Sequence, residues 1–221
     1  MIQRKIFDKI SKELTQDDNV LGIMLMGSVA TNQATPESDL DIMILGQETA
    51  FKTETVDNIL VEYIFTTYQN RLGKILENDM EVYHFLKSEI VYDPNHQLEQ
   101  LRNTAIDKYE NFKTKKVTKE GIAHWLKSVK IKLNAAINTN DLVKQNFLVA
   151  TNSWPVIEAI WAVNDKPTPP SSSVLTYKKD LTIIPQADWF EQLFSNNLEL
   201  RVKVMLEIID WVLPKLSKDI I

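Results

Sequence analysis

The sequence contains no cysteine and only three histidines among its 221 residues. The absence of cysteine excludes disulfides, thiolate metal sites and a cysteine nucleophile. His84, His96 and His124 are scattered without the spacing of metal ligands, so we assign them no catalytic role. The chemistry of this chain therefore has to come from other residue types.

Long hydrophobic runs are also missing. No early apolar stretch resembles a signal peptide, and none approaches the roughly 20 residues of a membrane span. We therefore expect a cytoplasmic protein without membrane contact. The formal net charge of -5 argues against a broad nucleic-acid-binding face, which would require a basic surface. The 44% of hydrophobic residues is enough for sizeable cores, so the chain is globular.

Two aspartates stand one residue apart at the start of an apolar segment. Asp39 and Asp41 flank Leu40, and the segment 40–45 is predicted to be a strand. Because side chains alternate across a strand, the two acids share one face, while Leu40 and Ile42 share the other and can pack into a core. The two carboxylates should therefore point at one spot.

Acids in this arrangement repel one another, and aspartate is depleted in strands. At about 4 Å and an effective dielectric near 20, one carboxylate pair costs roughly 4 kcal/mol, which a raised pKa or a divalent cation relieves. Glu62 is the only charged residue inside a further apolar strand, 59–65. Three acids on neighbouring strands suit a hard cation such as Mg²⁺. The alternative is a turn cap at Asp39, an exposed strand position at Asp41 and an edge-strand charge at Glu62.

A Gly27-Ser28 pair, which closes an earlier apolar strand, completes a known pattern. Met26-Gly27-Ser28, nine further residues, Ser38 to Ile42 and then Val61-Glu62-Tyr63 resemble the nucleotidyltransferase superfamily typified by DNA polymerase beta. Within that superfamily the chain is most similar to small antibiotic nucleotidyltransferases, such as the kanamycin, streptomycin and lincosamide enzymes. The match covers about residues 18–68.

The resemblance implies a role for each acid. Asp39 and Asp41 would hold one or two Mg²⁺ ions that bridge the triphosphate of a nucleotide, with ATP the favoured donor. Glu62 would either complete the metal shell or act as general base for the acceptor hydroxyl, and the sequence does not separate these roles.

The turn and the loop near the acids are the expected nucleotide-binding elements. Gly27 lets the backbone approach the phosphates, and Ser28 offers a hydroxyl and a backbone N–H at the start of a short helix that runs to about Gln33. Ser38 is a further candidate for nucleotide binding, although a simple turn hydroxyl is the alternative role.

The pattern along the chain predicts an α+β protein, with a mixed nucleotidyltransferase-fold sheet and helices followed by a C-terminal helical bundle. We expect a catalytic domain at 1–95 and a helical domain at 96–221. In the first domain, Ile2, Ile6, Ile10 and Leu14 predict a helix that packs on the sheet. The other expected elements are strands near 20–26, 39–46, 51–56, 59–67 and 90–92, a helical stretch over 70–87, and later helices over 122–137, 142–163 and 198–212.

Three details of these segments stay open. Pro155 should kink or split the helix over 142–163. Arg71 and Arg102 could reach a phosphate, but each is as easily a solvated charge on a helix face.

Three classes of function remain in view. The favoured class is transfer of AMP from ATP to a hydroxyl of a small molecule, such as an antibiotic. The second is adenylylation of a protein partner, as in minimal nucleotidyltransferase antitoxins, and the third is an inactive nucleotide-binding protein. The retained acids Asp39, Asp41 and Glu62 weigh against the third. Related antibiotic-modifying enzymes can build the acceptor site between two subunits, so the resemblance allows a homodimer.

Overall fold

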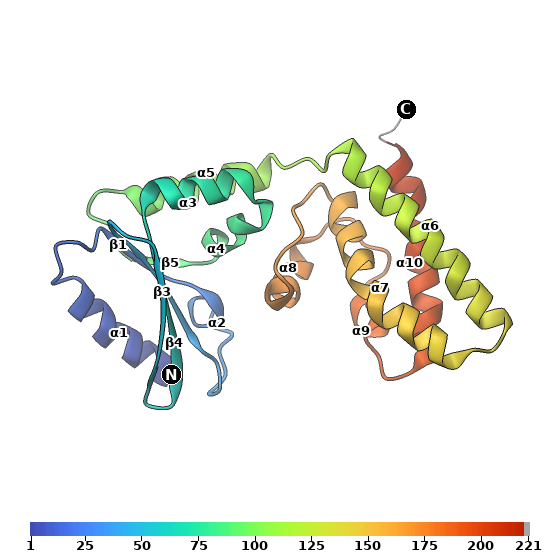
Figure 1. Cartoon of the computed structure of the whole chain (residues 1–221), viewed down its shortest axis with the longest axis horizontal. Helices are drawn as coiled ribbons and strands as arrows, with labels where there is room; N and C mark the ends of the chain where they lie inside the picture. The colour runs from blue at the N-terminus through green and yellow to red at the C-terminus, as the bar shows by residue number, and fades with distance from the viewer. Residues whose placement is uncertain (219–221) are drawn as a thin grey trace. The chain divides into compact units, whose positions relative to one another are not determined.

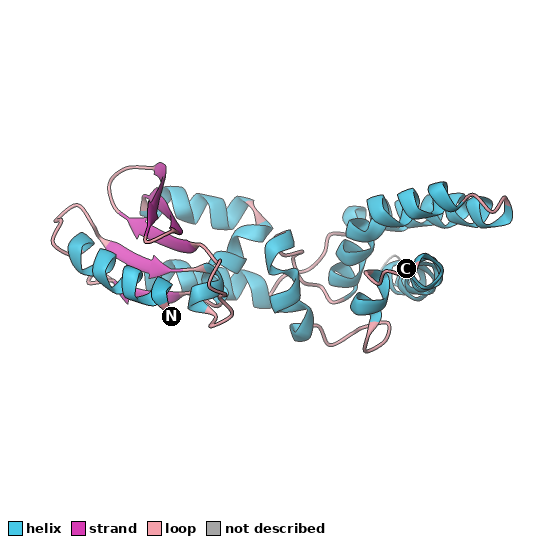
Figure 2. Ribbon diagram, turned by 90° about the horizontal axis from the view of Figure 1, so that it is seen from below, coloured by secondary structure: helices cyan, strands magenta, loops and turns pink. Residues whose placement is uncertain are grey.

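The computed structural model describes residues 1–218, and residues 219–221 of the expected helical domain lie outside this range. The chain divides into two compact units, Met1–Asn111 and Phe112–Ile221. Strands occur only in the first unit of the described chain (Figure 2). No helix in the part described is both long and apolar enough to cross a membrane. The α+β fold class is confirmed.

The first unit is built on a mixed five-stranded sheet with the order β3-β4-β2-β1-β5. Neighbouring strands β2 and β4 run parallel, and every other neighbouring pair is antiparallel. The predicted strands are confirmed, including the last one, which lies next to β1. The strands are β1 (Gly22–Leu25), β2 (Leu40–Leu45), β3 (Ala50–Val56), β4 (Ile59–Thr66) and β5 (Glu89–Tyr92).

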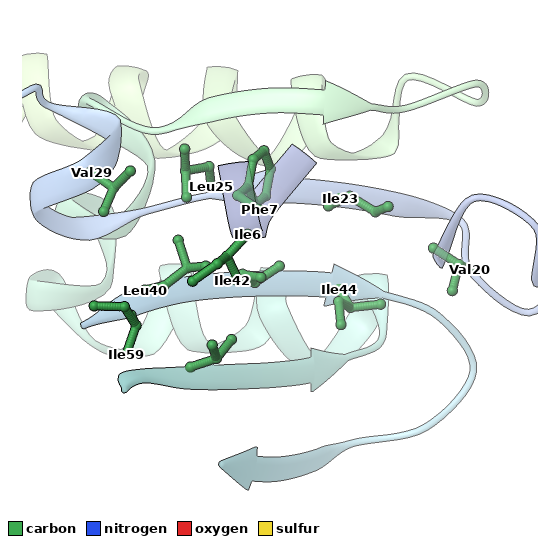
Figure 3. Packing of buried hydrophobic residues seen from close by; sticks show 11 residues of the cluster. Ile6, Phe7, Val20, Ile23, Leu25, Val29, Leu40, Ile42, Ile44 and Ile59 are labelled. Carbon is green, nitrogen blue, oxygen red and sulfur yellow. The ribbon is translucent and has the colours of Figure 1, made fainter. Parts of the chain in front are cut away.

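Helix α1 (Ile2–Leu14) covers one face of this sheet. Ile6 and Phe7 pack against alternate residues of the central strands, among them Leu40 and Ile42 (Figure 3). The expectation that Leu40 and Ile42 enter the core, on the face away from the acids, is thus confirmed. The expected apolar stripe of α1 was partly wrong, because Ile2 is 45% exposed whereas Phe7 is fully buried.

Three helices and a short 3₁₀ turn form the other layer of the first unit (Figure 1). The expected continuous helix over 70–87 is interrupted after α3, because Asn78 is extended and its side chain accepts a hydrogen bond from the N–H of Met80. The layer comprises α3 (Tyr68–Glu77), η1 (Asp79–Val82), α4 (Tyr83–Leu86) and α5 (Gln97–Glu110).

Helix α5 lies in the first unit, so the units divide one helix later than the boundary expected after residue 95. The reason is hydrophobic, since Leu98, Leu101 and Ala105 of α5 are fully buried and the helix packs against α3, α4 and β1. Asp93 caps this helix by accepting hydrogen bonds from the N–H groups of Gln97 and Glu99.

The described part of the second unit contains helices joined by loops and no strand. Helices α6, α7 and α10 pack against one another pairwise, and their shared core includes Leu133, Val149 and Ile209. Helix α7 is not split, because it continues through Pro155 to Val163. The elements are α6 (Lys116–Asn138), α7 (Leu142–Val163), η2 (Ser171–Ser173), α8 (Val174–Tyr177), η3 (Lys178–Asp180), α9 (Trp189–Leu193) and α10 (Leu198–Lys218).

Candidate active site

Two of the predicted acids lie side by side on the parallel strands β2 and β4. Asp41 is in register with Glu62, so the two side chains project from the same face of the sheet. Both side chains are partly buried. The flanking residues Leu40 and Val61 are also in register and are fully buried on the opposite face. Because acids and apolar residues alternate along both strands, the two carboxylates lie on one face of the sheet and the hydrophobic core lies on the other.

Asp39 lies just before β2, at the end of an exposed loop, and its own side chain is exposed. Its charge still acts on its neighbour. Burial raises the pKa of Asp41 from its ordinary 3.8 to about 6, and the negative charges of Asp39 and Glu62 act in the same direction. The structure therefore brings Asp39 and Glu62 within electrostatic reach of Asp41. A cation in this place would favour the ionised form of Asp41 and reverse the shift.

The Gly27-Ser28 turn closes against this carboxylate. The backbone N–H of Met26 donates to the carbonyl of Asp41 at 3.0 Å, which holds the end of β1 beside β2. Gly27 has a φ of +66°, and a Cβ atom there would lie 2.1 Å from Oδ2 of Asp41. Only glycine fits at this position, because both the backbone angle and the space exclude a side chain.

Ser28 follows in α2 (Gly27–Ala30), a single helical turn that is shorter than the predicted helix ending near Gln33. The Oγ atom of Ser28 is buried and has no hydrogen-bond partner in the described structure. A buried hydroxyl without a partner is unusual and calls for an explanation such as an absent ligand. Ser28 directly follows Gly27, which lies against the side chain of Asp41. The Ser28 hydroxyl is therefore well placed to donate a hydrogen bond to an oxygen-rich ligand held beside the acids.

Ser38 has a structural task in the loop before Asp39. Its Oγ accepts a hydrogen bond from the N–H of Thr35 at 2.9 Å, and its own N–H donates to the carbonyl of Thr35 at 3.1 Å. A direct contact between Ser38 and a nucleotide stays a prediction.

Two residues near the acids were missed by the sequence reasoning. Thr53 of β3 is in register with Glu62 and therefore adjoins it on the same face. Gln3 of α1 is fully buried and donates to the loop that ends at Asp39. A signal for Gln3 does exist, because it lies three and four positions before the core residues Ile6 and Phe7 and so falls on the buried stripe of the helix.

The donor set fits Mg²⁺ in its chemistry. Within residues 1–218, no group of three or more His, Asp or Glu side chains is arranged to hold a metal ion together. Mg²⁺ is usually held by one or two carboxylates together with substrate phosphates and water, so a three-ligand protein cage is not required. Asp39 and Asp41 supply two carboxylates, and the cradle formed by Gly27 leaves no side chain between the turn and Asp41.

Part of the first unit is similar to a known protein family. Residues 8–95 match the family described as "Polymerase beta, Nucleotidyltransferase", and they contain Asp39, Asp41, Glu62 and the Gly27-Ser28 turn. No curated protein matches the sequence. Among solved structures, the chain is similar to a nucleotidyltransferase-like protein from Exiguobacterium sibiricum 255-15, with 13% identity and a TM-score of 0.47. That similarity covers 100% of this chain and 78% of the other.

Proposed function

Because residues 8–95 belong to the nucleotidyltransferase superfamily, we propose that this protein transfers AMP from ATP to a hydroxyl group of a small molecule and requires Mg²⁺. The observation that carries the proposal is the in-register pair Asp41 and Glu62, with Asp39 near enough to raise the pKa of Asp41. A cluster of like charges is unfavourable in the absence of a ligand, which makes it a candidate for a functional site. The adjoining turn with the buried hydroxyl of Ser28 is a suitable place for phosphate oxygens.

Each residue has a role in this proposal. Asp39 and Asp41 hold the cation, and Gly27 and Ser28 hold the triphosphate through the backbone and the hydroxyl. When bound, Mg²⁺ supplies positive charge at the triphosphate and orients its oxygens. Little covalent work falls to the protein, so these residues act chiefly by positioning the reactants and neutralising charge.

The proposed reaction exchanges one phosphorus–oxygen bond for another. The acceptor oxygen forms a bond to the α-phosphorus, the bond from that phosphorus to the β-phosphate oxygen breaks, and pyrophosphate leaves. The acceptor hydroxyl loses its proton to Glu62 if Glu62 is the general base, or to water if Glu62 is a metal ligand. Its position in register with Asp41 is compatible with both roles.

For the acceptor we propose a small antibiotic with free hydroxyl groups, of the aminoglycoside or lincosamide class. The support is the resemblance of the motif to antibiotic nucleotidyltransferases, together with a net charge of -5 that suits a cationic acceptor. We further propose a cytoplasmic location, where ATP and Mg²⁺ are available, and a homodimer as the arrangement in which related acceptor sites are built.

The test is a transfer assay with ATP labelled at the α-phosphate and a panel of aminoglycosides and lincosamides. We expect Mg²⁺-dependent label on one acceptor and its loss in Asp41→Asn. The charge-matched control is Glu48→Gln, which removes an exposed carboxylate from the loop between β2 and β3 and should leave transfer unchanged.

Glu62→Gln distinguishes the two roles of that residue. It should retain Mg²⁺-dependent nucleotide binding and lose transfer if Glu62 is the base, whereas it should weaken Mg²⁺-dependent binding if Glu62 is a ligand. Transfer by Asp41→Asn at the rate of the unmodified protein would overturn the proposal. Label appearing on a protein, and on none of the small molecules, would instead indicate a protein-modifying enzyme.

A further inference from the structure

Outside the acid cluster, Gln3 is a fully buried polar side chain. It lies in the first turn of α1 and is fully buried, between two residues that are exposed or half-buried. Its Nε2 atom lies 2.8 Å from the carbonyl oxygen of Thr35, 3.1 Å from that of Ser38 and 3.4 Å from that of Pro36. An amide nitrogen has two hydrogens, so the two shortest of these contacts define its hydrogen bonds.

These hydrogen bonds end on a small closed turn. The N–H of Ser38 donates to the carbonyl of Thr35, and the N–H of Thr35 donates to the hydroxyl of Ser38. The carbonyl of Ser38 belongs to the peptide unit whose nitrogen is that of Asp39. Gln3 therefore fixes the orientation of the peptide plane from which Asp39 projects.

Asp39 has few other restraints of its own. It precedes the first residue of β2, Leu40, and so lies outside the strand, and its side chain is exposed. Asp41, by contrast, lies within β2 between β1 and β4. The position of Asp39 relative to Asp41 thus depends on the turn that Gln3 holds.

Gln3 is not needed to attach α1 to the sheet. Ile6 and Phe7 pack into the core, and the guanidinium of Arg4 makes two hydrogen bonds to the carboxylate of Glu89 in β5, at 2.5 and 2.7 Å. A buried amide is costly unless it is fully hydrogen-bonded, and Oε1 of Gln3 has no partner in the described structure. An apolar side chain of the same size would fill this position at a lower free-energy cost, because it would bury no unpaired polar atom. The two hydrogen bonds donated by Nε2 are therefore what a glutamine provides here and an apolar residue does not.

We propose that Gln3 is a positioning residue that holds the Ser38–Asp39 peptide so that the carboxylate of Asp39 is presented, together with that of Asp41, to a divalent cation and its nucleotide. This inference rests on the proposed function. Residues that orient metal ligands from behind commonly change metal affinity or activity by about 10–100-fold when they are substituted.

The test uses Gln3→Met, which keeps the length of the side chain and removes its donors. The matched control is Arg4→Met, which loosens the same turn of α1 from β5, because the hydrogen bonds and ion pairs given for Arg4 in the described structure go to Glu89 and Asp8. Ser38→Ala is a second variant that opens the same turn from its hydroxyl side, and it keeps the test valid if Gln3→Met does not fold.

The first readout is amide hydrogen exchange in the metal-free protein, which needs no activity. Gln3→Met should increase exchange at the amides of residues 35 and 37–39 by about tenfold or more, while Arg4→Met leaves these amides unchanged. Unchanged exchange in Gln3→Met would overturn the inference.

The second readout is the Mg²⁺ concentration that gives half-maximal binding of ATP. We expect an increase of about 10–100-fold for Gln3→Met and less than about twofold for Arg4→Met. An equal Mg²⁺ requirement in Gln3→Met and the unmodified protein would overturn this inference alone and leave the proposed function standing. Absence of Mg²⁺-dependent ATP binding in the unmodified protein would overturn the proposed function and this inference with it.

Discussion

Substituting Asp41 by asparagine should stabilise the protein in the absence of divalent cations, although it removes a residue we place at the centre of the site. The pKa of Asp41 is raised from 3.8 to about 6, because the side chain is partly buried and lies near Asp39 and Glu62. A raised pKa means that ionised Asp41 destabilises the folded state. One pKa unit corresponds to about 1.36 kcal/mol, so the penalty is about 3 kcal/mol once Asp41 is ionised in the folded state.

The pH dependence has a definite sign. Between about pH 4 and 6 the folded protein keeps a proton on Asp41 that the unfolded chain has lost, so the contribution of Asp41 to stability falls as the pH rises through this window. The asparagine side chain of the variant does not titrate. The gain in stability from Asp41→Asn should therefore be close to zero below about pH 4, grow between about pH 4 and 6 and be complete above about pH 7.

Urea denaturation of both proteins in EDTA, at several pH values from about 4 to 8, measures this gain. We expect a difference of about 3 kcal/mol at pH 8, or several degrees in Tm for a chain of this size. Glu48→Gln is the control for loss of one exposed negative charge, and it should change stability by less than about 0.5 kcal/mol. A gain that is absent at pH 8, or equal at pH 4 and pH 8, would refute the argument that burial and the two neighbouring acids destabilise ionised Asp41.

Two further substitutions test neighbouring parts of the first unit. Gly27→Ala should destabilise the protein by at least about 1–2 kcal/mol and abolish ATP binding, because the added Cβ would lie 2.1 Å from Oδ2 of Asp41. The control is Gly73→Ala in α3, where an added Cβ meets nothing within 4 Å, and it should be neutral or stabilise the protein by up to about 1 kcal/mol. Equal effects of the two substitutions in urea denaturation would contradict this prediction. Arg71→Met should cost about 3–5 kcal/mol in the same measurement, since it leaves the carboxylate of Glu81 without its partner at 2.6 Å, and a loss below about 1 kcal/mol would show that this ion pair is dispensable.

The sheet could be predicted from the sequence because strand signals are local. Runs of apolar residues predicted β2 and β4. The acids at the start of β2 and within β4 indicated which face of each strand is polar. The alternation of side chains along a strand shows which face Asp41 and Glu62 occupy. It places them close together only if β2 and β4 are also neighbours in the sheet. Our expectation that the two strands are neighbours has no local signal behind it, since they are separated in sequence by β3.

The features that could not be predicted depend on tertiary contacts. Arg71 was expected either at a phosphate or on a solvated helix face, but it is 2% exposed and paired with Glu81. Burial lowers the pKa of its guanidinium, and the charge of Glu81 opposes this. This pairing spans the break at Asn78, which composition alone does not reveal. Gln3 was overlooked for a related reason, since its partners lie in a loop more than thirty residues away.

The most direct test of the account is thermal unfolding with each of ATP, GTP, CTP and UTP, with and without Mg²⁺, for the unmodified protein and for Asp41→Asn. A ligand at about 100 times its Kd stabilises the folded state by about 2.7 kcal/mol, which raises Tm by several degrees in a chain of this size. We expect a Mg²⁺-dependent rise in Tm with ATP for the unmodified protein and none for Asp41→Asn, even though the variant starts from a higher Tm. An equal rise in both proteins, or no rise with any nucleotide, would contradict it.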